Sequence, residues 1–189
     1  GVVDDVGTTL QASLRKVLTK NKAASGKEYD AITRRMGDGI VPMTYTKTEG
    51  EAVLKNLQSN RDLLGKNAAE DTAQRVVDAT TEAPIMSEVV DRLGNYIQIG
   101  IKPGAEKTWG QLREYRSELG KTITQAQNAV KNGTGTFAEV KALTQLKKAV
   151  EKDLEAAALA AGDDVFAMWK KADANYKSKV IPFQKGALK

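Results

Sequence analysis

The stretch SELGKT, residues 117–122, contains residue types that could bind a nucleotide, because its last three residues, Gly-Lys-Thr, close a Walker A phosphate loop. Such a loop also needs a glycine five residues before the glycine of the triplet, and that position is Tyr115. The triplet lies between Leu119 and Ile123, two positions of an apolar helix stripe. We therefore predict that this stretch is helical, that Lys121 faces solvent and that no nucleotide binds here.

Other candidate catalytic groups are paired acids and Ser-Glu dipeptides. The acid pairs lie near a chain end or at a helix start, without the apolar surroundings that would raise a pKa. A Ser-Glu pair is worth testing because muramidase domains are helical and use a glutamate, but neither pair is followed by a run of small residues. These groups are Asp4-Asp5, Asp163-Asp164, Ser87-Glu88 and Ser117-Glu118. We predict that the chain has no catalytic residues and is not an enzyme.

The residue types that the chain lacks exclude further chemistry. Its 189 residues include no cysteine and no histidine, which excludes disulfides and zinc–thiolate sites and removes the commonest general base. We therefore expect no metal site, no cofactor and no small-molecule substrate. No apolar run reaches the roughly 18 residues of a membrane span, and the first residues lack a signal-peptide pattern. Because neither end reads as a natural terminus, we expect a segment of a longer protein.

Charge is distributed unevenly along the chain. Residues 102–189 carry 16 Lys and Arg against 10 Asp and Glu, a net charge of +6, whereas residues 1–101 carry 13 against 14, a net charge of −1. One interpretation is that lysines interleaved with acids line solvated helix faces. The other is a basic surface for DNA or an anionic membrane. For the second interpretation, the candidate contacts are Lys170, Lys171, Lys177, Lys179 and Lys185.

Three helices are predicted in the C-terminal half, where apolar residues recur at intervals of three and four. Thr108 and Thr136 are natural N-caps for the first two helices, and Gly133 and Gly162 end them. Connections this short force antiparallel neighbours, so we predict an antiparallel three-helix unit over residues 108–181. The large apolar residues of the three stripes are Trp109, Leu112, Leu119, Ile123, Val140, Leu143, Val150, Leu154, Val165, Trp169 and Tyr176.

The N-terminal half is less regular. The stretches GIVPMTYT (39–46) and NYIQIGIKPG (95–104) alternate apolar and polar residues around Gly and Pro, which predicts extended connections or a short paired β ribbon. Pro84 is tolerated in the first turn of the last predicted helix of this half. These helices are predicted near residues 8–22, 27–37, 49–64, 67–79 and 83–94. We expect an all-α, multi-helix fold with two domains, an irregular helical region at 1–101 and the three-helix unit with its basic tail at 102–189.

Three phrases of the sequence are similar to a known class of viral proteins. TWGQLREYRSELGKTI, TFAEVKALTQLKKAVEKDLEAAA and DDVFAMWKKADANYKSKVIPFQKGALK follow one another from residue 108 to the end. They resemble helical segments of the very large tailed-phage virion proteins, the internal or ejection proteins that leave the capsid with the genome. The resemblance implies a structural helical module that assembles with other virion subunits or with itself, and it carries no catalytic residues over.

We therefore expect a non-enzymatic structural or interaction module of a phage virion or DNA-ejection protein, located in the virion and entering the bacterial host on infection. Two alternatives remain open. One is a bacterial helical interaction domain, such as an effector or adaptor fragment in the bacterial cytoplasm. The other is a basic helical nucleic-acid-binding domain, for which DNA or an anionic membrane surface would be the partner.

Overall fold

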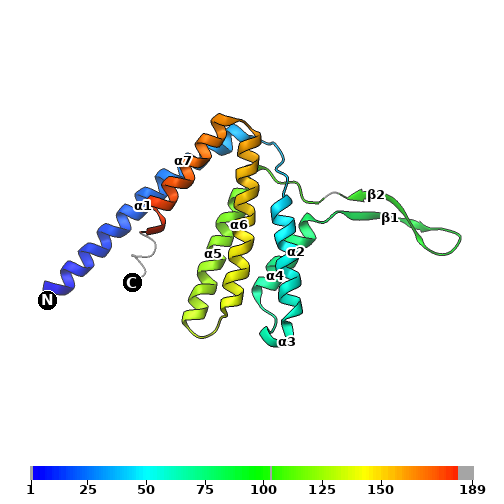
Figure 1. The fold of residues 1–189 in the computed structure, drawn as a ribbon, viewed down its shortest axis with the longest axis horizontal. Helices are drawn as coiled ribbons and strands as arrows, with labels where there is room; N and C mark the ends of the chain where they lie inside the picture. Colours follow the sequence, from blue (N-terminus) through cyan, green and yellow to red (C-terminus); the bar gives the residue numbers. More distant parts are fainter. Residues whose placement is uncertain (1, 103, 183–189) are drawn as a thin grey trace. The chain divides into compact units, whose positions relative to one another are not determined.

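The computed structural model describes residues 2–102 and 104–182, and most of these residues are helical. This part of the chain contains seven helices and one two-stranded antiparallel sheet (Figure 1), which confirms the predicted helical fold with a short β ribbon in the N-terminal half and a C-terminal group of helices. The elements are α1 (Val2–Met36), α2 (Thr44–Ser59), α3 (Arg61–Leu64), α4 (Ala68–Thr80), β1 (Ala83–Val90), β2 (Tyr96–Lys102), α5 (Trp109–Lys131), α6 (Phe137–Ala160) and α7 (Asp163–Lys179).

The chain forms two compact units, one of which combines its two ends. The first unit takes residues up to 37 and from 158 onward, so that α1 and α7 belong together, and the second takes residues 38–157. The division predicted between residues 101 and 102 therefore does not coincide with the compact units. That prediction rested on the local punctuation Lys102-Pro103-Gly104, whereas the units depend on which apolar helix faces meet.

In the first unit, α1 and α7 run antiparallel along each other. Near the start of α7, Asp164 pairs with Arg35 in the last turn of α1. At the other end of α7, the Asn21 side chain donates a hydrogen bond of 2.8 Å to the carbonyl oxygen of Lys179. α1 is one continuous helix where two were predicted, because residues 23–26 contain no proline and continue it.

An aromatic pair lies in the core of this unit. The rings of Tyr29 and Trp169 meet edge to face, with centroids 5.9 Å apart and planes at 64°. Both side chains are buried, together with Ile32 on α1 and Val165 on α7. The spacing on α7 correctly predicts that Trp169 is buried, and the structure adds that α1 supplies its aromatic partner.

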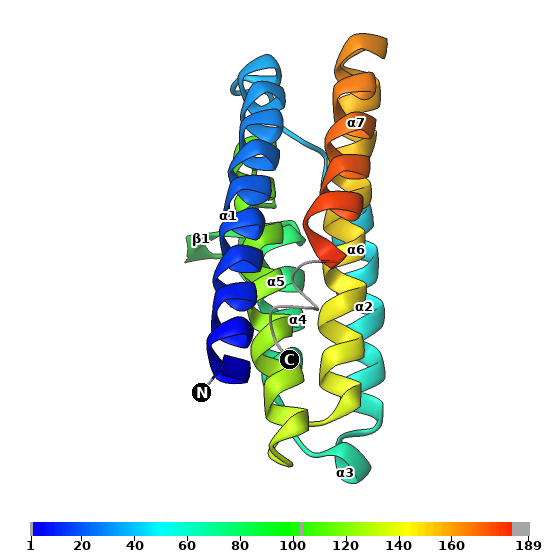
Figure 2. The same ribbon diagram turned by 90° about the vertical axis from the view of Figure 1, so that its left-hand side faces the viewer.

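In the second unit, α2 packs against α4, and α5 and α6 form an antiparallel hairpin. Figures 1 and 2 show α5 and α6 side by side, joined at one end by the connection 132–136. The indole of Trp109, at the start of α5, donates a hydrogen bond of 3.0 Å to the carbonyl oxygen of Leu154 near the end of α6. Both residues are buried, as are Leu119 and Val150 of the predicted stripes.

Local sequence signals explain the start of α5 and the stretch inside it. The Thr108 hydroxyl accepts a hydrogen bond of 3.3 Å from the Gln111 amide, and the Gln111 side chain accepts one of 3.0 Å from the Thr108 amide. Residues 117–122 lie within α5, where Lys121 is exposed and pairs with Glu118 at 2.7 Å. The helical prediction for SELGKT is therefore confirmed, and a helical backbone does not form the loop that cradles phosphate groups.

Residues 83–102 form a β-hairpin, so the helix predicted over 83–94 is wrong. β1 and β2 pair antiparallel, with Pro84 opposite Ile101 at the open end of the hairpin. The valines and isoleucines of this segment are β-branched and suit a strand. The proline was compatible with either structure, because it is tolerated both in a first helical turn and near the start of an edge strand.

The other segment predicted to be extended, residues 39–46, does not belong to this ribbon. The amide of Val41 donates a hydrogen bond of 2.9 Å to the carbonyl oxygen of Lys107, and Ile40 forms an isolated bridge with Thr108. α2 already begins at Thr44. The partner of β2 is therefore β1, its neighbour along the chain.

Candidate interaction surfaces

The hairpin carries the largest group of exposed apolar side chains in the described part of the chain. Ile85 and Met86 are neighbours, and so are Val89 and Val90, and neighbouring side chains of a strand point to opposite faces. Apolar side chains are therefore exposed on both faces of the hairpin. The exposed large apolar residues are Ile85, Met86, Val89, Val90, Leu93, Tyr96, Ile97, Ile99 and Ile101.

This composition is unusual for a hairpin surrounded by water. Strands that are apolar on both faces are typical of sheets that are covered on both faces. A two-stranded hairpin alone is also only marginally stable in water, because it buries little surface. Large apolar side chains gathered in one exposed segment make the hairpin a candidate interaction surface.

The tip of the hairpin is held by the carboxylate of Asp91. One of its oxygens, Oδ1, accepts hydrogen bonds from the amides of Leu93 and Asn95, at 2.8 and 2.9 Å. The hydrogen bonds from these amides hold the pKa of Asp91 below its ordinary value. Gly94 has a φ of 83°, which a side chain rarely tolerates. This fixed turn presents Leu93, whose side chain is 86% exposed, at the end of the hairpin.

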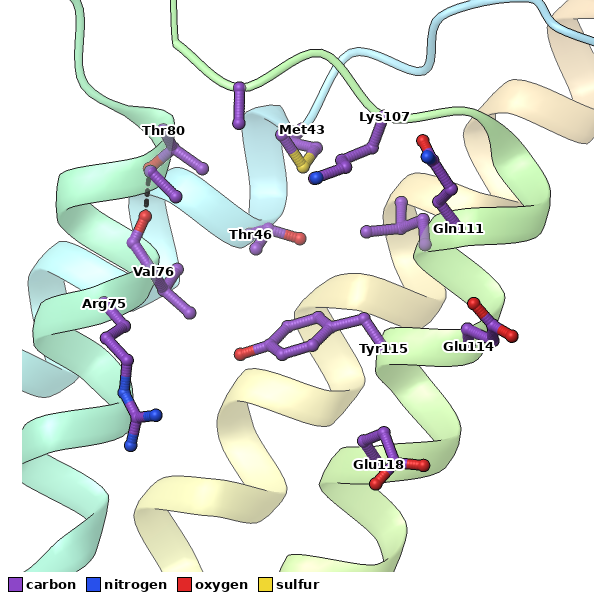
Figure 3. Close-up of a pocket in the computed structure, with 13 residues that line it drawn as sticks. Met43, Thr46, Arg75, Val76, Thr80, Lys107, Gln111, Glu114, Tyr115 and Glu118 are labelled. Atoms are coloured by element: carbon purple, nitrogen blue, oxygen red, sulfur yellow. Dashed lines mark hydrogen bonds between the residues drawn. The ribbon is translucent and has the colours of Figure 1, made fainter.

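A second surface is the groove between α4 and α5, shown in Figure 3. It encloses a cavity of about 640 Å³, and Met43, Val76 and Leu112 are among the apolar residues that line it. Charged side chains also line it, including Arg75 from α4 and Glu118 from α5. The mixture of an apolar lining with a few charged groups is typical of binding sites in general.

The phenol ring of Tyr115 extends from α5 into this groove, toward Arg75 on α4 (Figure 3). Burial raises the pKa of Tyr115, and the positive charge of Arg75 acts in the opposite direction. Tyr115 is the residue that stands where a phosphate loop would need glycine, and the structure places it on the groove side of α5. It therefore shapes the groove and does not belong to a nucleotide-binding loop.

One hydroxyl–carboxylate pair near the groove has the composition of a nucleophile and its base. The hydroxyl of Thr46 donates a hydrogen bond of 2.6 Å to Asp153. The same carboxylate also accepts hydrogen bonds from the amides of Tyr45 and Thr46, at 3.0 and 2.8 Å, at the start of α2. These bonds assign Asp153 a structural task, because the first amides of a helix lack partners within the helix. Sequence reasoning missed this residue, since a cap supplied by a distant helix leaves no local signal.

The lysines predicted to contact an anionic surface lie on α7 and beyond it. Lys170 stands over the ring of Phe166, with its ammonium 4.7 Å from the ring centroid, and Lys177 pairs with Asp173 at 2.7 Å. Lys171 and Lys179 are exposed, whereas Lys185 lies outside the described residues. With four lysines against three aspartates, α7 has a net charge of only +1. The structure therefore does not gather these lysines into a strongly basic face of α7.

On α1 the basic residues outnumber the acidic ones by more than on α7, and several of them lie along one side of the helix. Residues 15–35 carry seven Lys and Arg against two Asp and Glu, a net charge of +5. Lys16, Lys20, Lys27 and Arg34 are exposed, and at 100° per residue they fall within an arc of about 40°. This stripe lies on the side of α1 opposite the buried Ile32. The sequence contained the signal, because the helical period can be applied to charges as well as to apolar residues.

Within residues 2–102 and 104–182, no three acidic side chains gather in a way that could hold a metal ion. None of the helices in the same ranges is long and apolar enough to cross a membrane.

Comparisons with protein-family models, with curated proteins and with solved structures find no match to this chain. The surfaces described above are therefore the basis for proposing a function.

Proposed function

We propose that this chain is a non-enzymatic assembly module, in which the hairpin of β1 and β2 is the docking element for another protein subunit. The observation that carries the proposal is the exposure of large apolar side chains on both faces of this hairpin. Covering apolar surface contributes about 25 cal/mol per Å². A partner that encloses the hairpin would therefore draw much of its binding free energy from this short segment.

We further propose that the assembly is a tailed-phage virion, from which the chain enters the bacterial host with the genome. The support is the order of three phrases from residue 108 to the end, which resemble helical segments of internal and ejection proteins. These phrases form α5, α6 and α7, which suits a protein that works through helix packing.

Mass spectrometry of purified particles tests the virion proposal. Particles are purified on a density gradient from cells infected with the phage whose reading frame contains this sequence, and their proteins are digested with trypsin. We expect peptides of this chain in the particle fraction, at a constant ratio to the portal protein. Peptides found only in the particle-free cytoplasm would contradict the proposal and favour a bacterial interaction domain.

A second candidate function is binding to the DNA backbone, which the stripe of Lys16, Lys20, Lys27 and Arg34 favours. Lysines and arginines that neutralise phosphates release counterions, so binding of this kind weakens steeply as salt rises. The expected signature is a loss of affinity for duplex DNA of any sequence between about 50 and 200 mM salt.

Charge-reversal variants locate such a contact. Changing Lys16, Lys20 and Lys27 together to Glu should abolish DNA binding, measured by fluorescence anisotropy. The matched control changes the three α7 residues Lys170, Lys171 and Lys179 to Glu, and it should keep most of the affinity. Equal losses of DNA affinity in both variants would show that the α1 stripe is not the DNA contact. If the unmodified chain does not bind DNA, this second candidate function is excluded.

A further inference from the structure

The first half of α1 extends past the end of the helix that packs against it. α7 ends at Lys179, whose carbonyl oxygen accepts the hydrogen bond from the Asn21 side chain. Figures 1 and 2 show α1 continuing beyond this point toward the N-terminus. Residues 2–20 are therefore the part of α1 that α7 does not reach.

Three large apolar side chains of this half are exposed and lie along one side of the helix. Val6, Leu10 and Val17 have exposed fractions of 41–63%, and at 100° per residue they fall within an arc of about 40°. This apolar stripe is turned by roughly 90° from the side of α1 that carries the buried Tyr29 and Ile32. Because α7 packs on the side of Tyr29, it leaves the apolar stripe accessible.

The segment that carries the apolar stripe contains bases and no acids. Residues 6–27 include five Lys and Arg and no Asp or Glu, a net charge of +5. Three of these bases, Lys16, Lys20 and Lys27, belong to the basic stripe described above and are exposed. They lie about 40–80° around the helix from the nearer edge of the apolar stripe. Apolar and basic side chains therefore share one side of α1.

We propose that this side of α1 binds the surface of an anionic lipid membrane. Val6, Leu10 and Val17 enter the boundary between headgroups and acyl chains, and the neighbouring lysines reach the headgroup phosphates with their flexible stems. A helix with such a side lies in the plane of the membrane interface and does not cross the bilayer. The inference goes beyond the proposed assembly function and does not depend on the hairpin.

The two features together favour lipid over the other partners. A DNA backbone would pair with the lysines but would leave the apolar stripe in water. A protein surface could cover the stripe, but a run of five bases without an acid suits a partner that is negative throughout. An anionic lipid surface supplies both the negative charge and the apolar layer directly beneath it.

Vesicle co-sedimentation tests the charge requirement. We expect the chain to bind vesicles of equal parts phosphatidylcholine and phosphatidylglycerol and not vesicles of phosphatidylcholine alone. Binding should weaken as salt rises, because salt screens exposed charges. Changing Lys16, Lys20 and Lys27 together to Glu should abolish binding. The α7 variant used as the DNA control changes the net charge equally and should keep most of the affinity.

A second pair of variants tests the apolar stripe. Leu10→Ser should weaken binding to the anionic vesicles by about 10-fold, because it removes a large apolar side chain from the lipid contact. The control is Leu159→Ser on α6, since the exposed fractions of the two leucines are similar, 60% for Leu10 and 54% for Leu159. Circular dichroism should show the same helix content in both variants as in the unmodified chain.

A fluorescent label measures insertion separately from affinity. The chain contains no cysteine, so a polarity-sensitive dye attached to an introduced cysteine reports one position. On addition of anionic vesicles, the emission of a dye at Leu10→Cys should shift to the blue, because the dye leaves water for the acyl boundary. The same dye at Leu159→Cys should keep its emission in water.

Three results would overturn this inference. The first is that the chain does not bind anionic vesicles even at low salt. The second is binding that Leu10→Ser leaves unchanged, together with an unshifted dye at position 10; the contact is then purely electrostatic, as expected for the DNA candidate. The third is an equal loss in Leu10→Ser and Leu159→Ser, which would place the lipid contact on another surface. None of these results bears on the hairpin or on the presence of the chain in phage particles.

Discussion

The carboxylate of Asp153, on α6, binds both the backbone amide and the hydroxyl of Thr46, on α2, at 2.8 and 2.6 Å. Asp153 is 2% exposed, and it supplies the cap that the residue before α2, Met43, does not provide. A carboxylate near a helix N-terminus also complements the helix dipole. This relationship ties α2 to α6 through buried polar groups.

Removing this carboxylate should destabilise the fold. Asp153→Ala leaves two amides at the start of α2 without partners, which should lower the free energy of unfolding by about 1–3 kcal/mol. Urea denaturation measures the loss, and Glu155→Ala, an exposed position on the same helix, is the control. Asp153→Asn keeps an acceptor and should cost less than Asp153→Ala. A loss no greater than that of the control would contradict the capping role.

The aromatic pair predicts how the first unit responds to a cavity. Trp169→Ala removes a buried ring that contacts Tyr29, so it should lower the free energy of unfolding by about 3–5 kcal/mol. Phe137→Ala, at an exposed position on α6, is the control for loss of a large apolar side chain. A loss below about 1 kcal/mol for Trp169→Ala would show that the ring does not lie in a core.

The stability of the turn at the hairpin tip should depend on pH. The pKa of Asp91 is lowered from its ordinary value of 3.8 by hydrogen bonds from backbone amides, so its ionised form stabilises the turn. This contribution is present above the ordinary value and is lost as the pH falls through the lowered pKa. The amide resonances of Leu93 and Asn95 should therefore shift together in acid. Asp91→Asn should remove this shift, and a shift that persists in the variant would assign it to another group.

The pKa of Tyr115 should report the surroundings of its phenol group in the groove. Burial raises the pKa of Tyr115, and Arg75 partly opposes this effect. Arg75→Gln should therefore raise the pKa of Tyr115 further, as measured by the ultraviolet absorbance of tyrosinate, with Tyr115→Phe identifying the transition. Arg92→Gln, at an exposed position of the hairpin tip, is the control. An unchanged pKa in Arg75→Gln would show that the two side chains do not interact.

The SELGKT stretch should not bind nucleotides. ATP or GTP with magnesium should leave the melting temperature unchanged, because a ligand that binds the folded state must raise it. The test is a thermal melt at several nucleotide concentrations. A saturable rise that Lys121→Ala abolishes would overturn the helical interpretation of this stretch.

Local patterns by themselves determined most of the helices. The three- and four-residue spacing of apolar side chains located α5, α6 and α7, and Thr108 marked where α5 begins. A helix forms its backbone hydrogen bonds within one segment of the chain. Its apolar period and its caps therefore depend on residues that are close together in the sequence, and local patterns can predict them. The segment 83–90 was harder, because a strand depends on a partner and its proline suited either structure.

Only the tertiary structure decided which faces meet. Trp169 carries the apolar spacing of a core residue, but nothing near it in the sequence names Tyr29 as its partner. Asp153 reads as one more acid on a charged helix until its distance to Thr46 is known. The alternation in residues 95–104 predicted an extended segment, but only the structure shows that the isoleucines of β2 are exposed. The physical reason is that apolar burial is non-directional, so the sequence specifies which side chains need cover but not what covers them.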